Sequence, residues 1–314
     1  MRVLVTGGAG FVGSNLCRRL VTTAGVEHVV VLDDLSTGST HNLLEVDSDV
    51  VEVHVGSILD TAALERATRG TTTIVHLAAR PSVARSLADP LASHAANATG
   101  TVEVLEAARR AGAHVVVASS SSVYGATQTL PKHEDLPTRP MSPYAASKLA
   151  TEAYTNAYAH SFGLPTLALR LFNVFGPRQP AGHAYAAVVP AFIEAALDGR
   201  PLQIDGDGRQ TRDFTYVDTV AGVIADAVVR RISDPEPVNL AFGTRTDLLT
   251  LIEMLEQVIG QPLARQHRPP RTGDVRDSQA DSTRLRALFP DVVPVPLEDG
   301  LSATVEWMRG LRRG

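Results

Sequence analysis

The chain opens Met1-Arg-Val-Leu-Val-Thr-Gly-Gly-Ala-Gly-Phe-Val-Gly13, and this stretch, with the twenty residues after it, decides the fold. Residues 2–6 are a short apolar run rich in β-branched side chains, which predicts a buried strand. Residues 14–20 have the apolar spacing of a helix, and the next apolar run, 28–32, ends at Asp33. Strand, glycine turn, helix, strand and acid in this order are typical of a dinucleotide-binding βαβ unit.

The glycine turn and the acid each have a physical role at such a site. Gly7 allows a sharp turn, Gly10 lets a pyrophosphate approach the backbone, and Gly13 lets the helix pack close to the sheet. The first N–H groups of the helix attract phosphate. Asp33, twenty residues after Gly13, can accept hydrogen bonds from both ribose hydroxyls and would repel a 2′-phosphate, which favours NAD over NADP. The cofactor contacts predicted here are Gly7, Gly10, Phe11, Val12, Gly13 and Asp33.

Composition narrows the class of protein. The chain has 314 residues, 44% of them hydrophobic, which is enough for one large or two ordinary globular domains. A net charge of −5 gives no electrostatic argument for binding nucleic acid or an anionic membrane. The single cysteine, Cys17, excludes a disulfide framework, and the scattered histidines predict no metal site. Without a signal-like start or a long apolar run, we expect a cytoplasmic protein.

Strand-like and helix-like stretches alternate through the first half of the chain. This alternation predicts an α/β fold, a Rossmann-type doubly wound parallel sheet with helices on both faces. The expected strands are 2–6, 28–32, 50–55, 73–79, 114–118 and 166–171, and the expected helices are 14–20, 61–67, 90–111 and 143–161. After Asn173 prolines and glycines punctuate shorter elements, with an amphipathic helix at 248–259. We therefore expect a Rossmann domain over 1–174, with return segments near 213–243, and a smaller α/β substrate-binding domain over 175–314.

The strongest chemical signal is Tyr144-Ala-Ala-Ser-Lys148. Residues four apart lie on one face of a helix, so the Lys148 ammonium is expected beside the Tyr144 phenol. A positive charge there would lower the phenol pKa from its usual value near 10 and make it a usable base. The run Ser119–Ser122 follows a predicted parallel strand, at the sheet edge where ligands bind. Its hydroxyls are candidate partners for a sugar hydroxyl.

With these residues in view, the chain resembles the extended short-chain dehydrogenases/reductases of the nucleotide-sugar epimerase and dehydratase group. Within that group it is most similar to the UDP-glucose (UDP-galactose) 4-epimerases. The resemblance covers nearly the whole chain and is carried by residues 6–13, 76–79, 119–125, 142–148, 170–177, 212–218 and 271–274.

This resemblance implies a mechanism. Ser120, four residues before the tyrosine of the Val-Tyr-Gly signature, matches the catalytic serine, and Tyr144 would take the proton from the C4 hydroxyl of the sugar. Lys148 would hold the nicotinamide ribose and lower the tyrosine pKa. Hydride passes from C4 to a retained NAD, the 4-keto sugar rotates, and hydride returns to its other face. The implied partners are a UDP-sugar and, through helices near 93–111 and 143–161, a second copy of the chain.

The resemblance also implies contacts beyond the motifs themselves. Further cofactor contacts are expected at Ser57, Ile58, Leu77, Ala78, Ala79, Arg80 and Asn97, in addition to Tyr144 and Lys148. Substrate contacts are expected at Ser120, Ser121, Ser122, Tyr144, Asn173, Arg178, Arg212, Arg271, Asp274 and Ser278. Of these, Arg212 and Arg271 would bind the UDP diphosphate, since guanidinium pairs with phosphate through two hydrogen bonds.

Departures from the family pattern bear on the reaction and the substrate. Ser121 and Ser122 stand where 4,6-dehydratases have an Asp-Glu pair, and hydroxyls of ordinary pKa cannot replace that acid and base. Ser122 also replaces a glutamate of the UDP-xylose-forming decarboxylases. Pro180 stands where UDP-glucuronate 4-epimerases bind the carboxylate with an arginine, although Arg178, His183 and the serines remain possible partners. Ser278 is small where a tyrosine would exclude N-acetylated sugars.

These departures favour plain 4-epimerisation and leave the sugar open. Glucose, galactose, their N-acetyl forms and uronates all remain. The other readings are an NAD(P)-dependent dehydratase or reductase that releases its cofactor, and a protein that binds NAD without chemistry. Ser57 stands where the family has an aspartate on adenine, so that base would be held by a hydroxyl, by Asp60 or by backbone.

Overall fold

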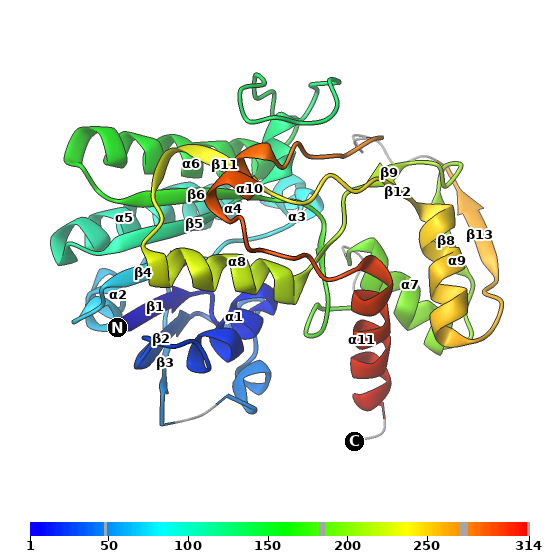
Figure 1. Cartoon of the computed structure of the whole chain (residues 1–314), viewed down its shortest axis with the longest axis horizontal. Coiled ribbons are helices and arrows are strands. Elements are labelled where there is room, and N and C mark those ends of the chain that lie inside the picture. Colours follow the sequence, from blue (N-terminus) through cyan, green and yellow to red (C-terminus); the bar gives the residue numbers. More distant parts are fainter. Residues whose placement is uncertain (47–48, 182–185, 270–275, 313–314) are drawn as a thin grey trace.

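A seven-stranded, fully parallel sheet forms the core of the larger part of the molecule (Figure 1). The computed structural model describes residues 1–46, 49–181, 186–269 and 276–312. The strand order is β11-β6-β5-β4-β1-β2-β3. The strands are β1 (Arg2–Thr6), β2 (His28–Asp33), β3 (Val51–Val55), β4 (Thr73–His76), β5 (His114–Ser120), β6 (Thr166–Leu171) and β11 (Asp234–Leu240).

Helices cover both faces of the sheet, and the alternation of side chains along each strand shows why. Val3 and Val5 belong to a core with α1 (Phe11–Val21), α8 (Val217–Arg230) and α10 (Thr283–Leu288). Leu4, between them, faces the opposite core, which contains α2 (Thr61–Thr68) and α5 (Gly100–Ala111) and which α6 (Pro143–Phe162) borders through Tyr158. Strands buried on both faces read as unbroken apolar runs. The doubly wound parallel fold predicted from the sequence is confirmed.

Several predicted elements differ in detail. The strand expected over 73–79 ends at His76, and 77–79 form a loop. The helix expected over 90–111 is three pieces: α4 (Pro90–His94), a π-helical turn η2 (Ala95–Thr99) and α5. Strand β11 was not among the expected strands, because its Asp-Pro-Glu-Pro start is not strand-like; its register shifts between Asp234 and Val238. The helix expected at 248–259 is confirmed as α9 (Leu248–Ile259).

The second half of the chain has a core of its own beside the sheet (Figure 1). This core joins α9 to α7 (Val188–Leu197), α11 (Leu297–Gly310) and the parallel pair β8 (Leu202–Asp205) and β13 (Arg265–Arg268). The strand β13 comes from a basic stretch with prolines on either side, and pairing with β8 satisfies its backbone. Short pairs join β7 (Val174–Phe175) to β10 (Thr215–Tyr216) and β9 (Thr211–Arg212) to β12 (Thr246–Asp247).

Loops at the carboxyl ends of the central strands meet at one edge of the sheet. These loops follow Thr6, Asp33, His76, Ser120 and Leu171. In open α/β sheets this edge is where ligands bind. The smaller elements there are α3 (Val83–Ala88) and the 3-10 turns η1 (Thr40–Leu43) and η3 (Ser121–Tyr124). Across the described ranges, no helix has the length and apolar character needed to cross a membrane.

Candidate active site

The glycine turn between β1 and α1 is closed so tightly that side chains do not fit. Gly7 has φ +72°, and a Cβ on it would lie 2.7 Å from the backbone nitrogen of Ala78. A Cβ on Gly13 would lie 2.1 Å from the Gly7 carbonyl oxygen. The turn is therefore possible only with glycine at these two positions, and it leaves the backbone of residues 7–13 open to a ligand.

The N-terminus of α1 points an uncompensated positive dipole at this turn. Its N-cap, Gly10, has no side chain to accept from the first N–H groups, and no acid stands in the first turn. Arg18 and Arg19 lie in the last turn, where they suit the opposite end of the dipole. An anion at the first turn would find free donors, which is the arrangement that binds pyrophosphate in dinucleotide folds.

Asp33 ends β2 and is almost fully buried, with 8% exposure. Its Oδ2 accepts from Ala9 N and its Oδ1 from Leu35 N, each at 2.9 Å. Burial raises the pKa of Asp33, and the backbone donors oppose that rise. Each carboxylate oxygen has lone pairs left, so Asp33 can fix the glycine turn and still accept from a sugar hydroxyl.

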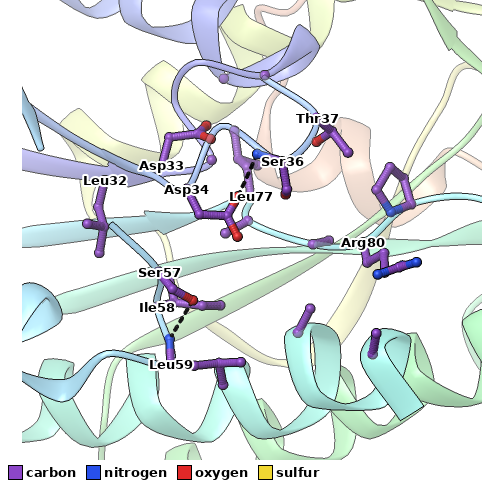
Figure 2. A pocket seen from close by; sticks show the side chains of 18 of the residues that line it. Leu32, Asp33, Asp34, Ser36, Thr37, Ser57, Ile58, Leu59, Leu77 and Arg80 are labelled. Carbon is purple, nitrogen blue, oxygen red and sulfur yellow. Dashed lines mark hydrogen bonds between the residues drawn. The ribbon is translucent and has the colours of Figure 1, made fainter. Parts of the chain in front are cut away.

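A cavity of about 800 Å³ runs along this edge of the sheet (Figure 2). Its volume lies within the usual range for ligand sites. The predicted cofactor residues that line it are Gly7, Gly10, Phe11, Val12, Gly13, Asp33, Ser57, Ile58, Leu77, Ala78, Ala79 and Arg80. The glycine turn, the free helix N-terminus and the acid at its edge together fit a dinucleotide such as NAD.

The structure adds residues to this lining that sequence reasoning missed. Polar ones come from the loop after β2 and from α3, and small ones from α3, α4 and η2: Asp34, Ser36, Thr37, Arg85, Ala88, Ala92, Ala95 and Ala96. The rule that ligands bind where parallel strands end could have found Asp34, Ser36 and Thr37. The alanines carry no signal in the sequence, because only the packing of three short helical pieces makes them a wall.

Ser57 and Asp60 are the two side chains predicted to replace the family's aspartate on adenine. Ser57 lines the cavity, and its hydroxyl accepts from Leu59 N at 3.1 Å (Figure 2). Asp60 is instead the N-cap of α2, accepting from Ala62 N and Ala63 N. Of these two side chains, only Ser57 lines the cavity, and backbone remains the third predicted partner.

Asn97 lies in the π-helical turn and fixes one wall of the cavity. Its Oδ1 accepts from Arg80 N at 2.7 Å, and its Nδ2 donates to Ser147 Oγ on α6 at 2.9 Å. Asn97 is therefore a bridge between the cavity loop and the helix of Tyr144 and Lys148. The extra residue of a π-helical turn re-aims side chains, and such turns are frequent at functional sites. The Arg80 guanidinium lies 3.5 Å from Asp89.

Tyr144, Lys148 and Ser120 come together where α6 packs on the end of β5. Tyr144 hydrogen-bonds to the Ser120 side chain, and Lys148 Nζ donates to Ala118 O at 2.8 Å. Burial raises the pKa of Tyr144, and the Ser120 hydrogen bond opposes the rise. The sequence predicted that Lys148 lowers the Tyr144 pKa, and this is wrong: burial raises it. The Lys148 amine donates to a backbone carbonyl instead. Burial also lowers the pKa of Lys148 to about 8.

The neighbouring serines offer hydroxyls to a ligand. Ser120 caps η3 by accepting from Ser122 N at 3.2 Å, while Ser121 begins that turn. The Ser122 Oγ is buried without a hydrogen-bond partner among the described residues. A buried hydroxyl without a partner costs free energy, so a polar group arriving beside it would be stabilised.

The predicted substrate residues are only partly brought together. Asn173 has φ +30° and donates to Asp213 O at 3.2 Å, and Arg212 donates to Arg276 O at 3.1 Å. Ser278 N donates to Thr211 O, beside Arg212. These three residues therefore lie around one short segment, residues 211–213. Arg271, Asp274 and His183 lie outside the described residues.

Arg178 contacts the Rossmann part of the fold. Its guanidinium donates to Glu45 at 2.6 Å and to Asn42 O at 3.3 Å, both near the η1 segment that follows β2. Its φ of +68° is unusual for a residue with a Cβ. Strained backbone of this kind persists where the surroundings fix it. The ion pair with Glu45 fixes Arg178 against the η1 segment.

Asp213, next to Arg212, holds this segment in place through its buried carboxylate. It is fully buried, and its carboxylate accepts from Gly243 N and Ala280 N at 3.0 Å each and from Thr244 Oγ1 at 2.8 Å. Burial raises the pKa of Asp213 above its ordinary value of 3.8, against the effect of these donors. Two separate chain segments, 243–244 and 280, thus meet on one carboxylate.

Replacing Asp213 with Ala should lower the free energy of unfolding by about 3 kcal/mol or more, because three buried donors lose their acceptor. Asp213→Asn should cost less than about 1 kcal/mol, since its amide oxygen can serve both N–H groups and its NH₂ can face Thr244. The folded state holds the Asp213 proton more tightly than the unfolded chain. The stability of wild type relative to Asp213→Asn should therefore fall as pH rises from about 4 through the raised pKa. Urea unfolding at pH 5 and 8 measures both effects. An Ala variant as stable as wild type would contradict the first. A difference between wild type and Asp213→Asn that is equal at both pH values would contradict the second.

The parallel sheet, glycine turn, cavity and Ser-Tyr-Lys set define a dinucleotide-binding protein of the short-chain dehydrogenase/reductase type. The profile of the NAD dependent epimerase/dehydratase family matches residues 3–241, and the chain belongs to that family. The chain is 42% identical to the UDP-glucose 4-epimerase of Mycolicibacterium smegmatis, with 98% of this chain and 99% of that protein covered.

Solved structures agree with this assignment. A UDP-N-acetylglucosamine 4-epimerase from Methanobrevibacter ruminantium, in complex with UDP-N-acetylmuramic acid, superimposes with a TM-score of 0.92 at 34% identity, covering 99% of this chain and 98% of that one. A UDP-glucuronic acid 4-epimerase from Bacillus cereus, in complex with UDP-glucuronic acid and NAD, gives a TM-score of 0.91 at 32% identity, covering 99% and 100%. The predicted family is confirmed.

Proposed function

We propose that this chain is a UDP-hexose 4-epimerase that retains NAD. The observation that carries the proposal is the meeting of Ser120, Tyr144 and Lys148 at the end of β5, with Ser121 and Ser122 as the next side chains. A dehydratase needs an acid and a base there, and two hydroxyls cannot serve. An epimerase needs only one proton acceptor beside a hydride acceptor.

The chain's own residues have separable roles in this reaction. Tyr144 takes the proton from the C4 hydroxyl and returns it, while Ser120, hydrogen-bonded to Tyr144, orients that hydroxyl. Lys148, whose pKa is about 8, carries a positive charge at neutral pH that favours the phenolate once a ligand displaces its carbonyl partner. Bound NAD supplies the hydride acceptor. The glycine turn, Asp33 and the cavity residues around Arg80 would hold it.

The two parts of the chain divide the binding. We infer that residues 1–174, with the return segments near 213–243, hold NAD. Residues 175–314 would hold the UDP-sugar, with Asn173 and Arg178 at the boundary and Arg212, Arg271 and Asp274 on the nucleotide. We also infer a homodimer through helices near 93–111 and 143–161. The exposure of Tyr154 and Phe162 on α6 supports that pairing.

The sugar is the open choice, and Ser278 bears on it. A serine there leaves room for an N-acetyl group. The similar Methanobrevibacter protein is a UDP-N-acetylglucosamine 4-epimerase, which agrees with this inference. The buried Ser122 Oγ offers a neutral donor to a uronate carboxylate, but Pro180 offers none. We expect UDP-glucose and UDP-galactose to interconvert and UDP-N-acetylglucosamine at least to bind.

Incubating the purified protein with each UDP-sugar, without added cofactor, and following the C4 epimer by NMR tests the proposal. Interconversion with NAD copurifying supports it. Net formation of NADH absorbance would favour a reductase instead, and bound NAD without turnover of any UDP-sugar would favour a binding protein. An absence of both turnover and inhibition by millimolar UDP-N-acetylglucosamine would count against the inference from Ser278.

A further inference from the structure

A buried ion pair lies behind Ser120 and Lys148. Glu152 is on α6, one turn after Lys148, and Arg170 is on β6. Arg170 Nε and Nη2 donate to the two carboxylate oxygens of Glu152 at 2.9 and 2.8 Å. Their side chains are 4% and 3% exposed. A bidentate ion pair of this kind has a rigid geometry. The cost of desolvating its two charges makes it a poor source of stability by itself.

The pair is bonded to the strand that carries Ser120. Glu152 accepts from the hydroxyl of Ser119, the residue before Ser120. Lys148 donates to Ala118 O one residue earlier. Side chains one helical turn apart thus attach α6 to successive residues of β5. This attachment fixes the end of β5 relative to the helix of Tyr144.

Arg170 continues the network past Ser120 on the other side. Its Nη1 donates to the Tyr124 hydroxyl at 2.9 Å, and Tyr124 donates to Asn239 on β11 at 2.7 Å. Tyr124 ends the η3 turn that Ser120 caps. Ser120 is therefore bracketed by Ser119 and Tyr124, and both are bonded to the same ion pair.

Glu152 also acts on the charge of Lys148. Burial lowers the pKa of Lys148 to about 8, and the Glu152 carboxylate opposes that fall. Of the other titratable groups nearby, Tyr144 lies one turn earlier on the same helix, bonded to Ser120, and His76 on β4 is the one on which the Lys148 charge acts. Burial and the Lys148 charge lower the pKa of His76 to about 3, so His76 adds no positive charge there. Glu152 is the one acid within the described residues that is seen to favour the ammonium.

We propose that Glu152, clamped by Arg170, is a positioning residue that holds the Ser120 turn and the Lys148 amine in place together where α6 meets the end of β5. The proposal rests on the function proposed above. It extends that function from the three residues that meet the substrate to a pair that acts through them.

The sequence makes a direct test practical, because Lys132 and Lys148 are its only lysines. In protein labelled with [ε-¹³C]lysine, NMR titration gives two signals, assigned with Lys132→Arg. In Glu152→Gln the pKa of Lys148 should fall by about one pH unit or more, which is the usual effect of losing an adjacent opposite charge. Lys132, whose amine donates to Thr127 O, should titrate as in wild type and serves as the internal reference.

Turnover should follow the same change. In Glu152→Gln the alkaline limb of the pH profile of kcat should move to lower pH by the same one pH unit or so, which is about a tenfold change in proton affinity. KM should change little. Glu152→Asp should restore the Lys148 pKa without restoring the full kcat, because the carboxylate is kept but falls short of Ser119 and Arg170. Glu256→Gln on α9, which also removes a carboxylate paired with an arginine, should leave both profiles unchanged.

If Glu152→Gln does not fold, Glu152→Gln/Arg170→Met removes the stranded charge with its partner, and such replacements are tolerated in buried pairs. It should still lower the Lys148 pKa. A Lys148 titration equal to wild type in either variant overturns the proposal, as does a Glu152→Gln pH profile that coincides with wild type. The titration is read without substrate, so a wild-type protein that epimerises no UDP-sugar would refute the proposed function separately.

Discussion

Replacing Tyr144 with Phe is expected to reduce epimerase turnover by about 10²- to 10⁴-fold, the usual contribution of a positioned acid–base group. In the proposed mechanism the phenol is the group whose proton transfer accompanies oxidation at C4, and Ser120 is its hydrogen-bond partner. The variant removes one oxygen and leaves the ring. The amount of NAD that copurifies should therefore be unchanged, because the glycine turn and the cavity that line the cofactor site are untouched.

The matched control is Tyr154→Phe, the same chemical change on the same helix but away from Ser120 and Lys148. Tyr154 lies on the face proposed to pair with a second copy, and the variant keeps the ring that would pack there. It should turn over like wild type. NMR of the epimerised sugar gives turnover, and absorbance after denaturation gives bound NAD. Wild-type turnover in Tyr144→Phe would end the proposed mechanism. Loss of NAD along with turnover would instead move the role of Tyr144 from chemistry to cofactor binding.

Replacing Gly13 with Ala is expected to weaken NAD binding roughly ten- to hundredfold, the effect of one to three kcal/mol of overpacking. The new methyl would lie 2.1 Å from the Gly7 carbonyl oxygen and 2.7 Å from the Gly8 Cα. Both are backbone atoms, so relief requires the glycine turn itself to move away from α1. The first N–H groups of the helix would then lose their place beside the pyrophosphate.

Gly222→Ala is the matched control, since it also places a methyl on a helical glycine. Its nearest neighbour would be the flexible end of Arg19, at 3.6 Å. It should bind NAD normally and be slightly more stable, because alanine is the better helix former. Titration of NAD into stripped protein measures both variants. Equal affinity in Gly13→Ala and Gly222→Ala would show that the turn does not set the cofactor site.

Local sequence was a good guide wherever one segment by itself determines the answer. The order strand, glycine turn, helix and acid predicted the first βαβ unit because those roles depend on backbone freedom and spacing within 33 residues. The apolar runs predicted the buried parallel strands, since a strand covered on both faces has no polar side. The pair Tyr144 and Lys148 was found by helical spacing alone.

Prediction failed where geometry depends on packing between distant segments. The break of the expected 90–111 helix into a π-helical turn places Asn97 against Arg80 and Ser147, and helical propensity shows none of this. Strand β11 exists because β6 offers it an edge, despite two prolines. The Tyr144 pKa was expected to be lowered, but burial raises it, and burial is not readable from a four-residue spacing.

The sequence by itself determined a dinucleotide-binding βαβ fold and the helical pair Tyr144 and Lys148, because backbone conformation and helical spacing are local properties. Its resemblance to a known family added the family assignment and the expectation that Ser120 is their partner. Only the tertiary structure decided what surrounds them. Glu152 bonds Ser119 and Arg170 across 33 and 18 positions of chain, and Asp213 joins Gly243 and Ala280 across 30 and 67. A buried charge must find its partners wherever the fold brings them, so the surroundings of the site are set by packing and desolvation rather than by any single stretch of sequence.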